Sequence, residues 1–243
     1  MEENKNNKKK IIIIIVGIIV VISLAICFIM AYKNNKSLVS GTISSGSSAS
    51  EISSEYDDIN YGSTSSLEGT TITSGGEYNL TGSYSCITVN TTSAVKLNLT
   101  DATITCDNGP AIYVEDADTV SIVLNGKNTI NSTTTEDLDG AIYSKDDIIF
   151  SGTGSLTVKS NYDGIVSKDT LVINSGTYII NADDDGIRGK DNVAIVDGTF
   201  TINAGGDGIK STNEEDSSKG YVAIDGGTFN ITSVLPHGPT CSA

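Results

Sequence analysis

Residues 163–209 read DGIVSKDTLVINSGTYIINADDDGIRGKDNVAIVDGTFTINAGGDGI, and this stretch decides the fold. The tripeptide Asp-Gly-Ile begins at residues 163, 185 and 207, a constant interval of 22 residues. Gly-Thr-Tyr at 176–178 and Gly-Thr-Phe at 198–200 keep the same interval. A unit this short cannot bury an apolar face alone, so successive units have to stack. The spacing therefore predicts a parallel β-helix with coils of about 22 residues.

The apolar residues within each unit alternate with polar ones. In Thr199-Phe200-Thr201-Ile202 the Phe and Ile share one face, which is typical of a strand. Stacking places equivalent residues about 4.8 Å apart. The predicted interior ladders are Ile165/Ile187/Ile209, Leu171/Val193/Val222, Ile173/Ile195/Ile224 and Tyr178/Phe200/Phe229. The in-out phase places the aromatic column in the core and argues against a sugar platform.

On either side of this stretch the interval between repeats is longer than 22 residues. Gly227 follows Gly198 by 29 residues, and the seven extra residues fall in the polar stretch STNEEDSSKG, where a loop can project. We expect an all-β, right-handed, single-stranded parallel β-helix over residues 70–243, preceded by one transmembrane helix. After Ser233 the chain reads VLPHGPTCSA, with no further acidic turn, so we expect a domain truncated at its C-terminus.

The N-terminal third divides into three segments. Residues 1–10 carry four lysines, and residues 11–32 form an apolar run long enough for a transmembrane signal anchor. The positive-inside rule places the N-terminus in the cytoplasm and the C-terminal domain outside the cell. A cleaved signal peptide and acylation at Cys27 are the alternatives. The Ser-rich residues 33–69 read as an extracellular linker.

The net charge limits the class of partner, and the cysteine spacing limits the possible disulfides. The formal net charge of −15 makes nucleic acid an unlikely partner and favours divalent cations. Cys86 and Cys106 lie 20 residues apart, nearly one coil, so either a disulfide between stacked neighbours or two buried free thiols fit the spacing.

The aspartates of the Asp-Gly-Ile motif form a column of like charges. At about 5 Å, each neighbouring pair repels by roughly 3 kcal/mol at an effective dielectric constant of 20, so a counter-charge is needed. Carboxylate and amide oxygens without His or Cys are hard ligands that suit Ca²⁺. A solvated acidic edge is the alternative. The predicted calcium ligands are Asp139, Asn161, Asp163, Asn181, Asp183, Asp185, Asn203 and Asp207.

A second column follows the inward isoleucines and should point outward. It contains aromatic rings and cations, which could stack on sugars and pair with uronate carboxylates. An ordinary mixed surface is the alternative. The predicted carbohydrate-binding residues are Tyr113, Tyr143, Arg188 and Lys210.

The repeated DGI, the Lys-Asp turns at 168–169 and 190–191, and the GT[YF]xIxA strand resemble the carbohydrate-binding domain family of clostridial surface proteins. The resemblance covers residues 139–232 best. It implies a calcium-binding parallel β-helix, related in fold to pectate lyases, that binds cellulosic or acidic polysaccharide without catalysis.

Two other functions compete with noncatalytic binding. A calcium-dependent pectate lyase needs a base of lowered pKa, and Lys145, Lys168, Lys190 and Lys210 are candidates. Three of these lysines recur in the same turn, each beside an Asp, which favours a structural role over one unique base. A structural adhesin or spacer would use the β-helix only as a stiff rod. We expect no enzyme activity and a single-pass protein of the cell surface.

Overall fold

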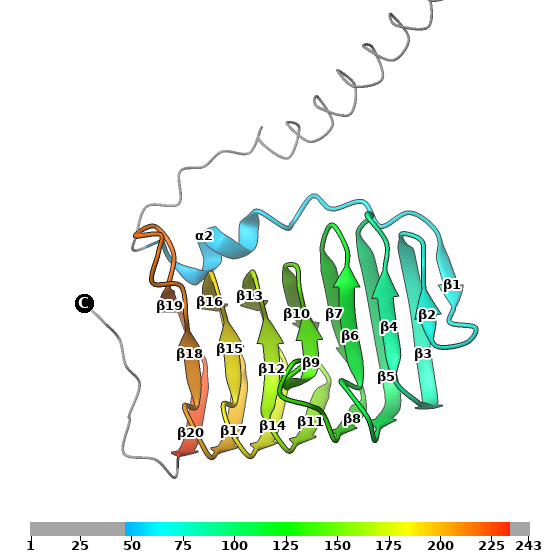
Figure 1. Cartoon of the computed structure of the whole chain (residues 1–243). Helices are drawn as coiled ribbons and strands as arrows, with labels where there is room; N and C mark the ends of the chain where they lie inside the picture. The colour runs from blue at the N-terminus through cyan, green and yellow to red at the C-terminus, as the bar shows by residue number, and fades with distance from the viewer. Residues whose placement is uncertain (1–46, 234–243) are drawn as a thin grey trace, which may run out of the picture. The chain divides into compact units, whose positions relative to one another are not determined.

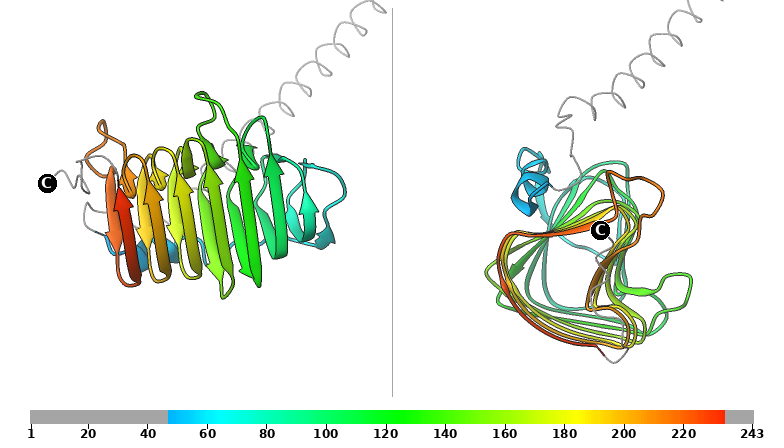
Figure 2. Two further views of the ribbon diagram at one scale, coloured as in Figure 1. Left: turned by 90° about the horizontal axis from the view of Figure 1, so that it is seen from below. Right: turned by 90° about the vertical axis from the view of Figure 1, so that its left-hand side faces the viewer.

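The structure, a computed structural model, describes residues 47–233. Parallel strands wind around a common axis and stack coil upon coil (Figures 1 and 2). The expected tail 1–10, membrane anchor 11–32, the first part of the linker and the expected truncated end lie outside the described residues. Within residues 47–233, no helix has the length and apolar character needed to cross a membrane.

Each coil from β6 onward contributes one strand to a seven-stranded sheet and two to a thirteen-stranded sheet, whereas in the coil of β4 the single long strand β5 takes the place of the two. The seven-stranded sheet consists of β2 (Thr71–Ile72), β4 (Ile87–Asn90), β6 (Ile112–Asp116), β9 (Gly140–Ser144), β12 (Asp163–Ser167), β15 (Ile187–Gly189) and β18 (Ile209–Ser211). The thirteen-stranded sheet consists of β1 (Thr64–Ser66), β3 (Gly76–Tyr84), β5 (Val95–Cys106), β7 (Val120–Asn125), β8 (Lys127–Ser132), β10 (Ile148–Gly152), β11 (Ser155–Ser160), β13 (Thr170–Ile173), β14 (Thr177–Ala182), β16 (Asn192–Ile195), β17 (Thr199–Ala204), β19 (Tyr221–Ile224) and β20 (Thr228–Ser233).

The register confirms the predicted ladders. Ile165 pairs with Ile187, and Ile187 with Ile209, across parallel strands. The Leu171, Ile173 and Tyr178 ladders are also in register with their partners one coil away. The rings of Tyr178 and Phe200 stack at 5.0 Å, and those of Phe200 and Phe229 at 4.8 Å. The aromatic column is therefore core: Tyr178 and Phe200 are buried, and Phe229, in the last described coil, is partly buried against them.

The glycine of the Asp-Gly-Ile motif is required by the spacing of the coils. A Cβ built on Gly186 would lie 2.5 Å from the carbonyl oxygen of Gly208 and 2.5 Å from Cγ2 of Ile202. Real Cβ atoms do not approach that closely, so any larger residue has to push the two coils apart. Packing between coils therefore determines which residues can occupy the Gly and Ile positions of the motif.

The seven extra residues between the last two units lie in the loop 212–220, which projects from the coil outline (Figure 2). Asp216 and Ser218 order this loop, and Lys219 ties it to Asp191 at 2.5 Å. A second insertion at 133–138 separates β8 from β9. These insertions explain why the interval between repeats varies although the coils remain stacked.

Part of the expected linker is folded. Residues 49–54 form helix α2 (Ala49–Ser54), which begins at Ser48 with a capping box involving Glu51. Ile52 packs against an apolar column on the outside of the thirteen-stranded sheet, formed by Ile149, Val172, Ala194 and Ala223. The backbone amides of Ala49 and Ser50 donate to Asp225 at 2.9 and 2.7 Å. The Ser-rich composition does not reveal this short helix, because the apolar column on which it packs lies on distant strands. We call α2 the strap.

Candidate functional site

The aspartate column forms hydrogen bonds between coils. The backbone amide of Asp185 donates to Oδ1 of Asp163 at 2.9 Å, and that of Asp207 donates to Oδ1 of Asp185 at 2.8 Å. Asp163 and Asp185 are 2% and 3% exposed. One oxygen of each carboxylate therefore serves the fold, and the second faces the neighbouring cations.

Arg188 and Lys210 supply part of the counter-charge that the aspartate column needs. Arg188 lies 2.5 Å from Oδ2 of Asp139 and 2.6 Å from Oδ2 of Asp163. Lys210 pairs with Asp185 and lies 3.8 Å from Asp207. Burial nevertheless raises the pKa of Asp163 to about 6, against the lowering effect of Arg188. Two of the predicted sugar-binding cations are thus already engaged with carboxylates.

One carboxylate oxygen in this region has no hydrogen-bond partner among residues 47–233, although it is buried: Oδ1 of Asp139. Nearby, one oxygen each of Asp163, Asp184 and Asp185 lie within 4.8 Å of one another. Burial and the charge of Asp185 raise the pKa of Asp184. These four aspartates form what we call the acid cluster.

The eight predicted calcium ligands do not meet at one place. Asp139, Asp163, Asp185 and Asp207 follow the ladder beside Arg188 and Lys210. Asn181, Asp183 and Asn203 line a groove beyond the turn, together with Asn161. The side chain of Asn161 bonds to the backbone of Thr134 at 2.7 and 3.1 Å, so it fastens the 133–138 insertion.

Aromatic and basic side chains gather on the outside of the seven-stranded sheet. Tyr113, Tyr143, Val166, Arg188 and Lys210 are in register along successive strands, as the sequence predicted. Val166 is fully buried and Tyr143 is only 5% exposed, because Tyr113 packs beside Tyr143 at 6.0 Å and Lys168 lies 5.3 Å above its ring. Tyr143 consequently offers a sugar little surface, whereas Tyr113 is half-buried.

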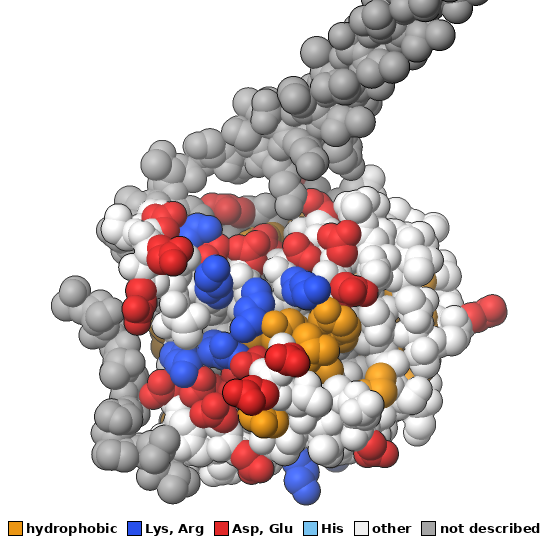
Figure 3. All heavy atoms as spheres, viewed as in Figure 1, with side chains coloured by type: hydrophobic (Ala, Val, Ile, Leu, Met, Phe, Trp, Pro, Cys, Tyr) orange, Lys and Arg blue, Asp and Glu red, His pale blue; other side chains and the backbone are white. Residues whose placement is uncertain are grey.

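Three lysines complete this surface. Lys145 lies 5.5 Å from the ring centre of Tyr113, and Lys168 lies over Tyr143. Burial, helped by Arg188, lowers the pKa of Lys168. Lys145, Lys168 and Lys190 form no salt bridge within residues 47–233. We call Tyr113, Lys145, Lys168, Arg188, Lys190 and Lys210 the basic face; Figure 3 shows Lys and Arg side chains gathered there, bordered by acidic ones.

The sequence marks these three lysines as candidate bases, and it also contains a signal that places them in a second outward column. Each follows an outward position by two residues, and a two-residue step in a strand returns to the same face.

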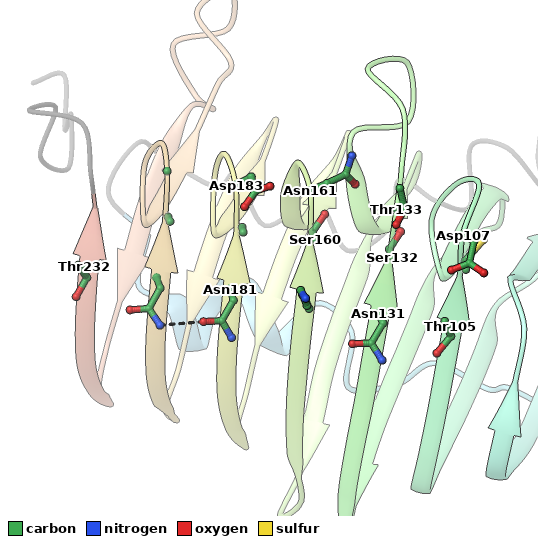
Figure 4. A pocket seen from close by; sticks show the side chains of 16 residues that line it. Thr105, Asp107, Asn131, Ser132, Thr133, Ser160, Asn161, Asn181, Asp183 and Thr232 are labelled. Carbon is green, nitrogen blue, oxygen red and sulfur yellow. Dashed lines mark hydrogen bonds between the residues drawn. The ribbon is translucent and has the colours of Figure 1, made fainter.

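A groove of about 730 Å³ runs on the other side of the acidic turns (Figure 4). Its floor is a row of polar residues, one from each of six strands, in mutual register. The row consists of Thr105, Asn131, Lys159, Asn181, Asn203 and Thr232. The groove therefore crosses the strands and follows the stacking axis.

The Cys86–Cys106 pair is a disulfide, with the two sulfur atoms 2.04 Å apart. Of the two alternatives that the spacing allowed, the structure has the bonded one. It fastens the beginning of β4 to the end of β5, away from the acid cluster.

Comparisons with known proteins agree with this architecture. Residues 67–236 match the family model described as carbohydrate-binding domain-containing protein. The chain is also similar to a solved polysaccharide lyase-like protein from C. thermocellum, studied as a gadolinium derivative. The two are 34% identical, with a TM-score of 0.65, over 70% of this chain and 75% of the other. No curated protein sequence matches the chain significantly.

Proposed function

The chain belongs to the carbohydrate-binding domain-containing family, and from this premise we propose that it binds acidic polysaccharide on the basic face, without catalysis. The observation that carries the proposal is the column of Lys145, Lys168 and Lys190 beside Tyr113, on a protein of net charge −15. The ammonium groups of exposed Lys145 and Lys190 and of half-buried Lys168 can pair with uronate carboxylates, and the Tyr113 ring can stack on a sugar.

The engaged cations help this recognition indirectly. Arg188 and Lys210 offset the charge of Asp139, Asp163 and Asp185, which would otherwise repel an anionic chain. The three lysines that form no salt bridge among residues 47–233 then make the potential near the basic face positive. An anionic chain can follow the column, because stacked coils repeat the lysine at about 4.8 Å.

Affinity electrophoresis tests the proposal. The full-length protein should be retarded in gels containing polygalacturonate, and the double variant Lys168→Ala/Lys190→Ala should bind about tenfold more weakly, as expected for two lost charge-assisted contacts. Lys127→Ala is the matched control, since it removes an exposed lysine from β8. Equal retardation of all three proteins would refute the role of the basic face.

Calcium is a proposed ligand of the acid cluster. Asp139, Asp163, Asp184 and Asp185 carry more negative charge than Arg188 and Lys210 offset, and Oδ1 of Asp139 is buried without a hydrogen bond. Oxygen donors of this kind suit a hard cation, and gadolinium, present in the derivative of the similar protein, is another. Bound there, Ca²⁺ would supply positive charge between the coils.

Calcium-dependent melting tests this proposal. We expect Ca²⁺ to raise the melting temperature and EDTA to reverse the rise, because a ligand of the folded state stabilises it. Asp184→Asn should reduce the shift, whereas Asp197→Asn, on an exposed turn, should not. A melting temperature that does not respond to Ca²⁺ would refute calcium binding by the acid cluster.

A lyase is the second candidate, favoured by one observation. The lowered pKa of Lys168 is what a base that abstracts the proton next to a uronate carboxylate requires. Release of unsaturated uronides from polygalacturonate, abolished in Lys168→Met, would establish the lyase. Binding without such products supports the noncatalytic function.

We propose in addition that residues 11–32 anchor the protein in the membrane and that its β-helix lies outside the cell. The apolar length of that segment and the lysines before it support this. Protease accessibility of the β-helix on intact cells, with release only by detergent, tests both.

A further inference from the structure

The groove on the other side of the acidic turns contains hydrogen-bonding groups that the fold does not use. The amide of Asn203 donates to Oδ1 of Asn181 at 3.0 Å, which leaves Oδ1 of Asn203 and Nδ2 of Asn181 without a partner within residues 47–233. The side chains of Asn131 and Lys159 form no hydrogen bond in the same part of the chain. This contrasts with Arg188 and Lys210, which are paired.

The geometry of the row suits an extended strand. Its residues come from β5, β8, β11, β14, β17 and β20, and each is paired in register with the next. At the ~4.8 Å spacing of neighbouring strands, the row is about 24 Å long. Figure 4 shows Thr105, Asn131, Asn181 and Thr232 distributed along it.

The charge of the groove disfavours a polyanion. Asp107 and Asp183 line its wall, and Lys159 is the one cation among the lining residues. Asp184, a member of the acid cluster, lies in the same turn as Asp183. An anionic chain would be repelled along this edge, whereas an uncharged chain would meet amides and hydroxyls that can donate and accept.

We propose that this groove is a second glycan site, separate from the basic face, and that it binds an uncharged glycan strand through the Asn131–Lys159–Asn181–Asn203 row. The lining contains no aromatic ring, so recognition depends on hydrogen bonds to hydroxyl or acetamido groups rather than on stacking. The free carbonyl and amide groups of the asparagines match both kinds of substituent.

Two neutral oligosaccharides distinguish recognition of hydroxyl groups from recognition of acetamido groups. Calorimetry with the full-length protein would compare cellohexaose, which carries only hydroxyl groups, with the hexamer of N-acetylglucosamine. Binding of either supports the proposal, and the tighter ligand identifies the preferred substituent. Failure of both to bind overturns it.

Matched variants locate the site. Asn181→Ala/Asn203→Ala should weaken binding by about tenfold or more, as expected when two or more hydrogen bonds are lost. Asn79→Ala/Asn98→Ala is the control, because it removes an equivalent side-chain bond of 3.0 Å outside the groove. If the first pair fails to fold, the single variant Asn131→Ala serves instead. Unchanged affinity in a groove variant that melts like the wild type overturns the assignment.

The test is independent of the proposed function. Lys168→Ala/Lys190→Ala should leave binding of the neutral hexamer unchanged, and the groove variants should leave retardation by polygalacturonate unchanged. Loss of both ligands in either variant would show one shared site and contradict a second one.

Discussion

Arg188 forms ion pairs with aspartates from the acidic turns of two other coils. Its guanidinium contacts Asp139 and Asp163, which come from the two coils before its own. Lys210 repeats the arrangement one coil later with Asp185, but its side chain is 29% exposed against 14% for Arg188. A planar, forked cation suits the position that has to serve two carboxylates at once.

Replacing Arg188 by Met should lower the free energy of unfolding by about 3 kcal/mol, because Asp163 would remain buried without its counter-charge. Denaturant titration measures the change. Lys210→Met should cost less, as the more exposed pair is partly screened by water. The reverse order of the two effects would contradict the role given to Arg188.

Removing Arg188 should also strengthen calcium binding, because the ion and the guanidinium compete for the carboxylate oxygens of Asp139 and Asp163. Calorimetric titration of Arg188→Met with Ca²⁺ should show a lower Kd than the wild type. A higher Kd would mean that Arg188 supports the metal rather than replaces it.

Asp169 gives the stability a pH dependence. Burial and a hydrogen bond with Asp191 raise the pKa of Asp169 to about 7, while the pKa of Asp191 is lowered. A carboxyl with a raised folded-state pKa stabilises the fold when protonated, and this contribution is lost as the pH rises through about 7. The melting temperature should therefore fall from about pH 4, near the ordinary pKa of an aspartate, to about pH 7, and level off above it. Asp169→Asn should flatten this fall, and an equally steep fall in the variant would exclude Asp169 as its cause.

At the scale of elements, α2 and the strands it covers depend on each other. Ile52 is 1% exposed against the outer apolar column, and burial raises the pKa of the Tyr56 hydroxyl close to Asp147. A helix of this length is not stable alone, so the docking contacts have to hold it. The strap covers an apolar surface that the coils would otherwise expose to water.

Ile52→Ala should destabilise the protein by about 2 kcal/mol, the lower end of the range for a buried isoleucine, because a short strap can adjust around the cavity. Ile179→Ala is the control, since Ile179 is 40% exposed on β14. Limited proteolysis should also cut the variant faster near residues 55–60. Equal stability of the two variants would show that α2 contributes nothing to the fold.

The ladders of inward residues could be predicted because a two-residue alternation and a 22-residue period define them locally. Arg188 and Lys210 were predicted to face outward, and they do. Their pairing with the aspartates could not be predicted, because it depends on side-chain reach between coils. The docking of α2 and the Asn groove also depend on residues brought together from distant strands.

At the scale of the whole molecule, each coil contacts mainly its two neighbours, so stability should be distributed along the stack. The disulfide closes a loop at one end, between β4 and β5, while α2 covers β13 and β16 near the other. These two fasteners act on different coils. The acid cluster lies in the same coils as the column that α2 covers, and it links these coils through Asp139, Asp163 and Asp185.

This arrangement predicts that reduction of the disulfide acts locally. Reducing Cys86–Cys106 should cost about 3 kcal/mol if loop entropy dominates. Hydrogen exchange should then lose protection in β3–β6 and keep it in β15–β17, because neighbouring coils transmit stability only stepwise. The wild type in the absence of reductant is the reference, and Cys86→Ser/Cys106→Ser should reproduce the reduced pattern. Uniform loss of protection along the chain would instead mean that the coils unfold as a single unit.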